Sequence, residues 1–282
     1  MCRFVLYMGP SIKMDSLITK PTHSIIVQSY HATERDEPLN GDGFGVAWYR
    51  PETGSLPALF RSVSPAWNNQ NLINLSRVLE SHCILAHVRA ASPGLPVTQF
   101  NCHPFTWKQF SFMHNGFIGD FQKIKRRARN LLSESSYNWI QGSTDSETFF
   151  ALFIDHYQQT TSDSETDRIA KALLATISTC KKLLTDAGIK ENCALNLVIS
   201  DGINAVATRF SSPGTVRHTL YLHTNASYRC DAGDIHLSPS DKQTVLIASE
   251  PLTTDDSWHA VDADYMITVK NANTVELIPI QF

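Results

Sequence analysis

Residues 145–157 read DSETFFALFIDHY, and this stretch predicts a helix at the centre of the chain. It follows the turn-forming residues 142–144, and two acidic side chains lie in its first turn, where the helix dipole favours them. Working outward, apolar residues at helical spacing predict further helices over residues 120–132 and 169–184. The polar residues 158–167, between the helices predicted at residues 145–157 and 169–184, predict a mobile loop.

Strands are predicted on both sides of this helical centre. Short apolar runs bounded by Gly, Pro or polar residues are typical of buried strands. They occupy residues 4–8, 44–49, 83–88 and 110–113 before the helices, and residues 194–200, 206–210, 219–223, 244–249 and 266–269 after them. The first is expected to end in a turn at Gly9-Pro10. The order of strands, helices and strands favours an α+β fold with largely antiparallel sheets. Because there is no internal repeat and no long linker, we expect a single domain over residues 1–282.

Composition excludes several classes of protein. The 24 basic and 27 acidic residues give a net charge of −3, and 42% of residues are hydrophobic, which excludes a mostly disordered chain and a basic nucleic-acid-binding domain. No run approaches about 18 apolar residues and no secretory signal is visible, so we expect no membrane span and a cytoplasmic location. The six cysteines are scattered without a CxxC, and the histidines lack ligand spacing, so reduced thiols, no metal and no cofactor are expected.

Cys2, directly after the initiator Met, is the most informative residue. A residue this small permits removal of Met1, after which Cys2 carries both a nucleophilic thiol and a free α-amine. An α-amine has a reference pKa of about 8 and is a suitable proton acceptor for the thiol at physiological pH. The alternative is an ordinary cysteine that leads a buried strand.

The tripeptide His114-Asn115-Gly116 follows the apolar run at residues 110–113. An Asn at a strand end, followed by Gly, can direct a side-chain amide and a backbone N–H at one point, which is the geometry of an oxyanion hole. Asn-Gly is also the strongest hairpin signal, so a turn is the alternative.

Two further segments carry charges that suit the two ends of an amino acid. Arg89 lies in AHVRAAS at residues 86–92, and the small residues after it leave room for a carboxylate held in bidentate fashion. Asp145 in GSTDSE, residues 142–147, could hold an ammonium group. The alternatives are a surface ion pair for Arg89 and a helix-capping or first-turn acid for Asp145.

The chain resembles the class II glutamine amidotransferases, which are N-terminal-nucleophile (Ntn) hydrolases. The resemblance rests on motifs in the same order, covering residues 2 to about 260: MCRF, NGDGFGVAWY, AHVRAAS, NCHPF, HNG, GSTDSE, and ASEPLT with Trp258. They are most similar to the standalone branch, which includes the ergothioneine-pathway γ-glutamyl hydrolase and the fungal glutathione-degrading amidotransferase subunit. The resemblance implies a four-layer α/β/β/α sandwich with two stacked antiparallel sheets.

The resemblance also implies a catalytic set. Cys2, exposed by removal of Met1, would be the nucleophile, and its α-amine would be the general base. The side chain of Asn115 and the backbone N–H of Gly116 would form the oxyanion hole.

A substrate-binding set is implied as well. Arg89, assisted by Ser92, would bind the α-carboxylate of the γ-glutamyl group, and Asp145 would bind its α-amine. His114 lies in a family motif and is expected near the substrate, as a positioning or packing residue.

The implied reaction is attack of Cys2 on the γ-glutamyl amide of glutamine or another γ-glutamyl compound. A γ-glutamyl thioester forms, and its hydrolysis gives glutamate together with ammonia or an amine. Relatives that make amino sugars have a Trp after the clamp Arg and a His shortly beyond, whereas this chain has Ala90 and Pro93, which predicts a different pocket shape.

Three activities fit this resemblance. The protein could be a glutaminase that passes ammonia to a partner protein, which would supply an acceptor or peptidase function. It could instead be a standalone γ-glutamyl peptide hydrolase with little glutaminase activity, or a catalytically idle regulatory or binding protein on the same fold. Neither a nucleic-acid partner nor a membrane is expected, and a homodimer is one option for the oligomeric state.

Three other sequence features that could indicate a binding, catalytic or metal site have simpler explanations. The basic run at residues 123–129 is expected on the solvated side of a helix. Cys102 and His103 are adjacent, and neighbours in a strand point to opposite faces, which argues against a Cys-His dyad or a metal site. Asp42 in GDGFG is expected to shape a tight turn.

Overall fold

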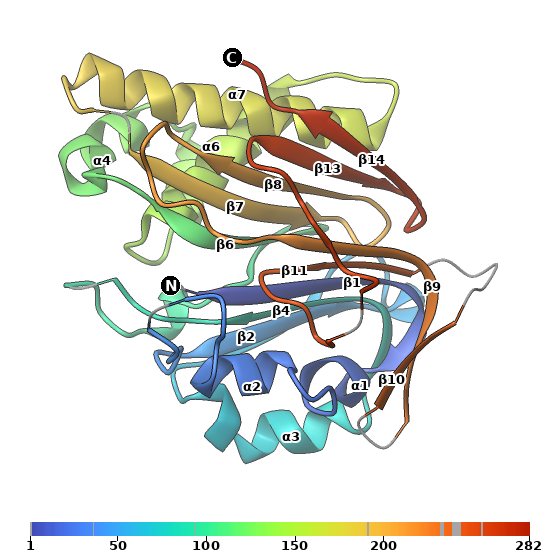
Figure 1. The fold of residues 1–282 in the computed structure, drawn as a ribbon. Coiled ribbons are helices and arrows are strands. Elements are labelled where there is room, and N and C mark those ends of the chain that lie inside the picture. The colour runs from blue at the N-terminus through green and yellow to red at the C-terminus, as the bar shows by residue number, and fades with distance from the viewer. Residues whose placement is uncertain are drawn as a thin grey trace.

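The computed structural model describes residues 2–35, 37–92, 94–190, 192–231, 234–238, 244–254 and 256–282. Two antiparallel sheets are stacked face to face, and helices cover the outer face of each (Figure 1). The predicted α+β fold with four α/β/β/α layers is therefore confirmed. Met1 and Pro93, about which the sequence makes predictions, lie outside the described residues.

The first sheet contains the N-terminal strand. In the described part of the chain its order is β10-β9-β11-β1-β4-β2-β3, with β12 also paired to β9. The bounds of its strands are β1 (Arg3–Lys13), β2 (Phe44–Tyr49), β3 (Ala58–Ser62), β4 (Glu80–Val88), β9 (Tyr221–Asp231), β10 (Asp234–Ser238), β11 (Thr244–Ala248) and β12 (His259–Ala260). Its outer face is covered by α1 (Asp15–Ile18), α2 (Ile25–Tyr30) and α3 (Gln70–Ser76).

The second sheet has the order β14-β13-β8-β7-β6-β5. The bounds of its strands are β5 (Phe105–Trp107), β6 (Phe110–Ile118), β7 (Cys193–Ser200), β8 (Ala205–Ser211), β13 (Tyr265–Lys270) and β14 (Thr274–Pro279). The helices that follow β6 in the chain are α4 (Phe121–Asn130), α5 (Glu134–Trp139), α6 (Asp145–Gln159) and α7 (Glu165–Asp186). They pack on the side of this sheet away from the first sheet (Figure 1). Short 3-10 turns lie at Pro51–Thr53, Ala66–Asn68 and Gln99–Asn101.

The side chains of β1 show how the layers are held together. Phe4, Leu6 and Met8 are buried in the core between the two sheets. Val5 and Tyr7 point to the opposite face and pack with the helices of the first sheet. This alternation follows from the two-residue period of a strand, and the part of β1 from Arg3 to Met8 is buried on both faces near the middle of its sheet.

Several elements differ from the sequence-based expectation. β1 does not end at Gly9-Pro10 but continues to Lys13, with a shift in its pairing register against β4 between Met8 and Ile12. The expected loop at residues 158–167 is shorter, because α6 extends to Gln159 and Ser164 caps α7 by accepting a hydrogen bond from the Asp167 N–H.

The elements that the sequence did not predict are short or exposed. They are α1, α2, α3, α5, β3, β5, β10, β12 and β14. The unpredicted helices have seven residues or fewer, so an apolar period of 3.6 residues is hardly visible in them. Among the described residues, no helix is both long enough and apolar enough to cross a membrane.

Candidate active site

Cys2 and Arg89 lie opposite each other at one end of the first sheet. β1 and β4 pair with Arg3 opposite Val88 and Phe4 opposite His87, and continuing this register by one residue places Cys2 opposite Arg89. Because side chains alternate along strands, Cys2 points with Phe4 toward the second sheet. The Cys2 thiol is half-buried, and its Sγ donates to the carbonyl of Ala90 at 3.6 Å.

The guanidinium of Arg89 has the surroundings of an anion-binding group. The residue is only 3% exposed, and among the described residues its side chain has one hydrogen-bond partner, the Asp42 carbonyl at 3.4 Å. No carboxylate within the described chain pairs with it. Burying a charge is unfavourable unless it is paired, and a guanidinium offers five N–H donors, so this site is suited to an incoming carboxylate. The surface-ion-pair alternative for Arg89 is wrong.

Asp42 supports this arrangement through its backbone and side chain. Its N–H donates to the Arg89 carbonyl at 2.9 Å, and its Oδ2 accepts from the Ala91 N–H at 2.8 Å. These bonds fix the chain on both sides of Arg89. They join two segments that are distant in sequence, and the turn-shaping role expected for Asp42 stays a prediction.

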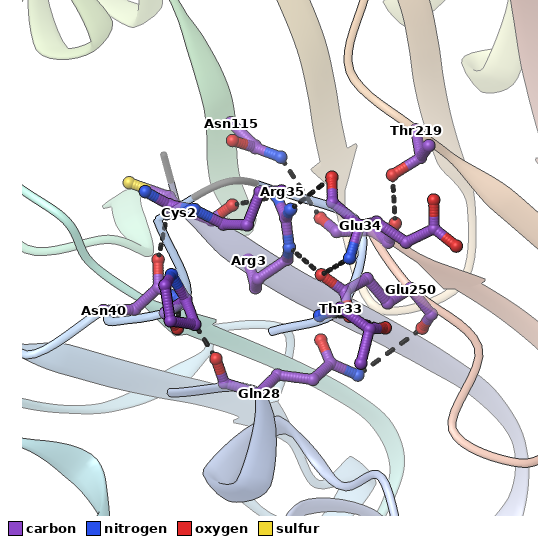
Figure 2. Close-up of polar contacts among 12 residues, drawn as sticks. Cys2, Arg3, Gln28, Thr33, Glu34, Arg35, Asn40, Asn115, Thr219 and Glu250 are labelled. Carbon is purple, nitrogen blue, oxygen red and sulfur yellow. Dashed lines mark hydrogen bonds and ion pairs between the residues drawn. The ribbon is translucent and has the colours of Figure 1, made fainter. Parts of the chain in front are cut away.

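Asn115 and Gly116 lie within a strand, so the hairpin alternative for Asn-Gly is wrong. β6 continues to Ile118 and pairs with β7, with Asn115 opposite Asn196 and Gly116 opposite Leu195. The Asn115 side chain is fully buried and reaches the first sheet, where its Nδ2 donates to Ser249 Oγ at 3.4 Å (Figure 2). Its Oδ1 has no hydrogen-bond partner among the described residues.

The backbone of Gly116 faces an unpaired edge of the second sheet. Among the described strands, β5 pairs with β6 only up to Phe112. Beyond it, the carbonyl of His114 contacts His87 Nε2 at 3.2 Å, and the N–H of Ile118 donates to Asp145 Oδ2 at 2.8 Å. Alternate residues of a strand direct their backbone groups to the same edge, so the N–H of Gly116 points between these two contacts.

Only glycine fits at position 116. A Cβ there would lie 1.8 Å from the carbonyl oxygen of Ala194 and 2.6 Å from His114 Nε2. Such distances are far below van der Waals contact, so the close approach of β6 and β7 depends on the missing side chain.

Asp145 is the first residue of α6, but it does not cap the helix. Thr144 is the cap and accepts from the Glu147 N–H at 3.1 Å. The two Asp145 oxygens accept the N–H groups of Ile118 and Ser146, each at 2.8 Å, and no basic side chain among the described residues pairs with this carboxylate.

Asp145 lines an open pocket of about 750 Å³. The pocket wall also includes Ser92 and Leu95 from the loop after Arg89, and Phe117 from β6. Ser92 is exposed, at the rim. The pocket therefore joins the loop that follows Arg89 to the start of α6, with a carboxylate on its wall.

The basic run of α4 has a more specific place than the predicted solvated face. Lys125 and Arg129 are half-buried and donate to the carbonyls of Ser143 and Gly142, at 3.4 and 3.3 Å. They hold the loop that leads to Asp145. Lys123, Arg126 and Arg127 are exposed, as predicted.

His114 lies on the far face of β6 from Asn115. Its Nδ1 contacts Ser146 Oγ at 2.8 Å and its Nε2 contacts the Ala194 carbonyl at 3.0 Å. Burial lowers the pKa of His114, although the Asp145 charge opposes this, so the ring is neutral near pH 7. With both nitrogens engaged, His114 joins α6 to the sheet, and its position does not favour the substrate contact predicted for it.

Within the part of the chain that the structure describes, the contacts of His87, His103 and Cys102 do not form a catalytic dyad or a metal site. The rings of His87 and His103 lie with centroids 4.4 Å apart and their planes tilted by 31°. Burial lowers the pKa of His87 to about 3 and that of His103 well below its usual range. The Cys102 thiol donates to the carbonyls of Ser62 and Thr98 rather than to an imidazole, and burial raises its pKa. Among the described residues, no three His, Cys, Asp or Glu side chains are grouped as a metal site.

A buried ionic network behind the nucleophile was not predicted from the sequence. Arg3 forms an ion pair with Glu250 and donates through Nη1 to the Cys2 carbonyl at 2.8 Å (Figure 2). Glu250 also accepts from the N–H and hydroxyl of Thr33, at 2.8 and 2.9 Å, and contacts His23 Nε2 at 2.8 Å. Burial alone would raise the pKa of Glu250, but these hydrogen bonds and the charge of Arg3 outweigh it and lower that pKa to about 2.

Arg35 adds a second cation on this side of the site. Its side chain is 8% exposed and donates to Asn40 Oδ1 at 3.0 Å. The pKa of Arg35 is lowered by burial and by the nearby Arg3, whereas the neighbouring Cys2 opposes this. Arg35 also forms an ion pair with the exposed Glu37, with Nη2 and Oε2 3.3 Å apart, so the positive charge it places on this side of the site is partly neutralised.

The motifs MCRF and ASEPLT contain Arg3 and Glu250, but they do not reveal that the two residues pair. His23, Thr33 and Arg35 lie outside the quoted motifs.

Comparison with known proteins identifies the family of the chain. The family model of class-II glutamine amidotransferases matches residues 18–281. The chain is 37% identical to the probable glutamine amidotransferase DUG3 of Saccharomyces cerevisiae, over 99% of this chain and 84% of the relative. It is 25% identical to the gamma-glutamyl-hercynylcysteine sulfoxide hydrolase of Mycolicibacterium smegmatis, over 98% of both chains.

Solved structures give the same result. A glutamine aminotransferase class-II domain protein from Silicibacter pomeroyi superposes with a TM-score of 0.70 at 25% identity, over 99% of this chain and 98% of the other. The glutamine phosphoribosylpyrophosphate amidotransferase of B. subtilis shares the fold, with a TM-score of 0.62 at 14% identity, and the present chain spans 50% of it. From its sequence match and its fold, the chain belongs to the class-II glutamine amidotransferases, a family of enzymes.

Proposed function

We propose that the protein is an N-terminal-cysteine amidohydrolase that cleaves the γ-glutamyl amide of glutamine or of a γ-glutamyl compound. The observation that carries the proposal is a pair of charges without ion-pair partners in the described chain: Arg89, which lies opposite Cys2, and Asp145, at the start of α6. Arg89 is a buried cation with no carboxylate partner, and Asp145 is a carboxylate with no basic partner, among the described residues. One fixed cation and one fixed anion suit the α-carboxylate and α-ammonium of a γ-glutamyl group.

Cys2 is the nucleophile in this proposal. Removal of Met1 frees the α-amine of Cys2, which accepts the proton of the thiol. The thiolate attacks the γ-carbonyl carbon, and a C–S bond forms as the carbonyl oxygen becomes an oxyanion. The protonated amine then gives its proton to the leaving nitrogen, the C–N bond breaks, and ammonia or an amine departs.

Asn115 and Gly116 stabilise the oxyanion. The Asn115 carboxamide reaches from the second sheet to the first, and the Gly116 N–H lies on the unpaired edge of β6. Hydrogen-bond donors directed at the developing negative charge stabilise the transition state. In the second half of the reaction, water loses a proton to the α-amine and attacks the thioester, which releases glutamate and the thiolate.

Arg89 and Asp145 align the substrate, with Ser92 assisting at the pocket rim. His114 acts indirectly, since it holds α6 and therefore Asp145 against β6 through Ser146. No metal or cofactor takes part in any of these steps.

We further propose that residues 1–282 form one domain and that the protein acts in the cytoplasm. Cys2, Cys83, Cys102 and Cys180 are free thiols, which suits a reducing compartment. Use of ammonia for synthesis, or action on longer peptides, would need a partner protein that supplies an acceptor or a peptidase.

A substrate series tests the proposal. Glutamine and γ-glutamyl dipeptides are compared by glutamate release, together with two analogues: 4-aminobutanamide, which lacks the α-carboxylate, and 4-carbamoylbutanoate, which lacks the α-amine. Each analogue is expected to lose about 10- to 100-fold in kcat/KM, because each forfeits one charge-assisted contact of about 1.5–3 kcal/mol.

Two variants assign each charge to its residue. Asp145→Asn should reduce kcat/KM for glutamine but barely for 4-carbamoylbutanoate, which has no α-amine to lose contact with. Arg89→Ala should reduce kcat/KM for glutamine but barely for 4-aminobutanamide, which has no α-carboxylate. Equal losses on both substrates would contradict the assignment. The preferred leaving group separates the two activities, since a glutaminase prefers glutamine and a peptide hydrolase prefers the dipeptides.

A further inference from the structure

Ser249 lies where the two sheets meet, between Phe4 of β1 and Asn115 of β6. It follows β11 directly, is fully buried, and is held on both sides by its backbone: its N–H donates to the Phe4 carbonyl at 3.0 Å, and its carbonyl accepts from Thr219 Oγ1 at 2.8 Å. Its hydroxyl oxygen accepts from the Phe4 N–H at 3.1 Å and from Asn115 Nδ2 at 3.4 Å. Ser249 therefore touches both the nucleophile strand and the proposed oxyanion donor.

Between Ser249 and Asn115, one hydrogen-bond acceptor lacks a donor and one hydroxyl proton lacks an acceptor within the described chain. Asn115 Oδ1 is buried without a hydrogen-bond partner among the described residues. The Ser249 hydroxyl accepts two hydrogen bonds, and no acceptor for its own proton is found in the described part of the chain. A buried carboxamide oxygen without a donor is unfavourable, and a serine hydroxyl can both donate and accept.

Rotation of the Asn115 carboxamide by half a turn would satisfy both groups. The rotation exchanges Oδ1 and Nδ2, so the Ser249 hydroxyl could donate to Oδ1. Nδ2 would then leave Ser249 and point to the place that Oδ1 now occupies. A buried amide N–H in that place needs an acceptor, which the oxyanion of the tetrahedral intermediate supplies.

We propose that Ser249 is a positioning residue for the oxyanion hole: its hydroxyl donates to Asn115 Oδ1 during catalysis and thereby aims Nδ2 at the substrate carbonyl. This inference rests on the proposed function of Asn115. Ser249 does not touch the substrate, so its loss affects the rate of the chemical step rather than substrate binding, which Arg89 and Asp145 provide.

The test is a double-mutant cycle between Ser249 and Asn115, measured by glutamate release. Asn115→Ala is expected to lower kcat by about 100- to 1,000-fold, as loss of an oxyanion donor does. Ser249→Ala is expected to lower kcat by about 10-fold with KM unchanged, and to cause no further loss when Asn115 is already Ala. Ser249→Cys separates loss of the hydroxyl from the cavity that Ser249→Ala would leave, because a thiol fills the space but is only a weak donor. If the hydroxyl is what matters, Ser249→Cys should lower kcat nearly as much as Ser249→Ala.

Ser81→Ala is the matched control. Ser81 is a buried serine in β4 whose Oγ donates to the Tyr49 carbonyl at 2.6 Å, near the end of β4 away from Cys2. Its replacement should reduce stability and leave kcat unchanged. The proposal is overturned if Ser249→Ala leaves kcat unchanged, or if it costs the same factor with and without Asn115. A normal kcat for Asn115→Ala would instead refute the proposed oxyanion hole itself, and the inference with it.

Discussion

Replacing Glu250 with Gln removes one charge from the buried network behind the nucleophile. Glu250 is fully buried, pairs with Arg3, and accepts the N–H and hydroxyl of Thr33. Its pKa falls from an ordinary value of 4.5 to about 2. Each pKa unit corresponds to about 1.4 kcal/mol, so the ionised group contributes about 3 kcal/mol to folding at neutral pH.

The direction of the pH dependence follows from this lowered pKa. The folded state binds the proton of Glu250 less tightly than the unfolded state, so protonation as the pH falls favours unfolding. The stabilisation by ionised Glu250 is complete above about pH 5, falls by about 2 kcal/mol between pH 5 and pH 3, and vanishes below about pH 2.

Chemical denaturation at several pH values measures both effects. Glu250→Gln should lower the free energy of unfolding at neutral pH by about 3 kcal/mol, since it leaves the Arg3 guanidinium buried without its counter-charge. The variant should also lose less stability than the wild type between about pH 5 and pH 3. Glu52→Gln is the matched control, because Glu52 is an exposed partner of Arg50 and should leave stability unchanged. A Glu250→Gln protein as stable as the wild type, with the same pH dependence, would refute the reasoning.

Three other substitutions have separate expected outcomes. Arg89→Ala should raise KM for glutamine by about 10- to 100-fold with a smaller effect on kcat, and unchanged saturation kinetics would contradict the carboxylate clamp. Gly116→Ala should destabilise the protein by about 3 kcal/mol or more, because the new Cβ would overlap the Ala194 carbonyl; a melting temperature equal to that of the wild type would contradict the packing argument. Cys102→Ala should leave kcat and KM unchanged in steady-state assays, since its thiol bonds only to backbone carbonyls, and an inactive variant would restore the Cys-His dyad.

Much of the fold could be predicted because long elements carry clear periods. The helix at residues 145–157 and the apolar runs of β2, β4 and β7 appear in the structure with small changes at their ends. Asn115-Gly116 shows why a local signal can mislead. As a dipeptide it favours a hairpin, but pairing with β7 along residues 111–118 keeps the chain extended.

The positions of the charged residues needed the three-dimensional structure. Arg3 and Glu250 are 247 residues apart in sequence, and no local pattern reveals that they form a pair. Ser249 lies in the ASEPLT motif, but only the meeting of the two sheets places it against Asn115. His114 adjoins Asn115 in the sequence, but strand alternation sends its ring to the opposite face, toward α6.

The most direct test of the central claim is the identity of the residue that carries the acyl group. The protein is mixed with a γ-glutamyl substrate, quenched in acid within the first turnovers, and examined by intact mass and peptide mapping. We predict a mature chain that begins at Cys2 and carries one γ-glutamyl group on that residue, with no adduct and no glutamate release in Cys2→Ala. An adduct on another cysteine, or undiminished glutamate release by Cys2→Ala, would contradict the assignment of Cys2 as the nucleophile.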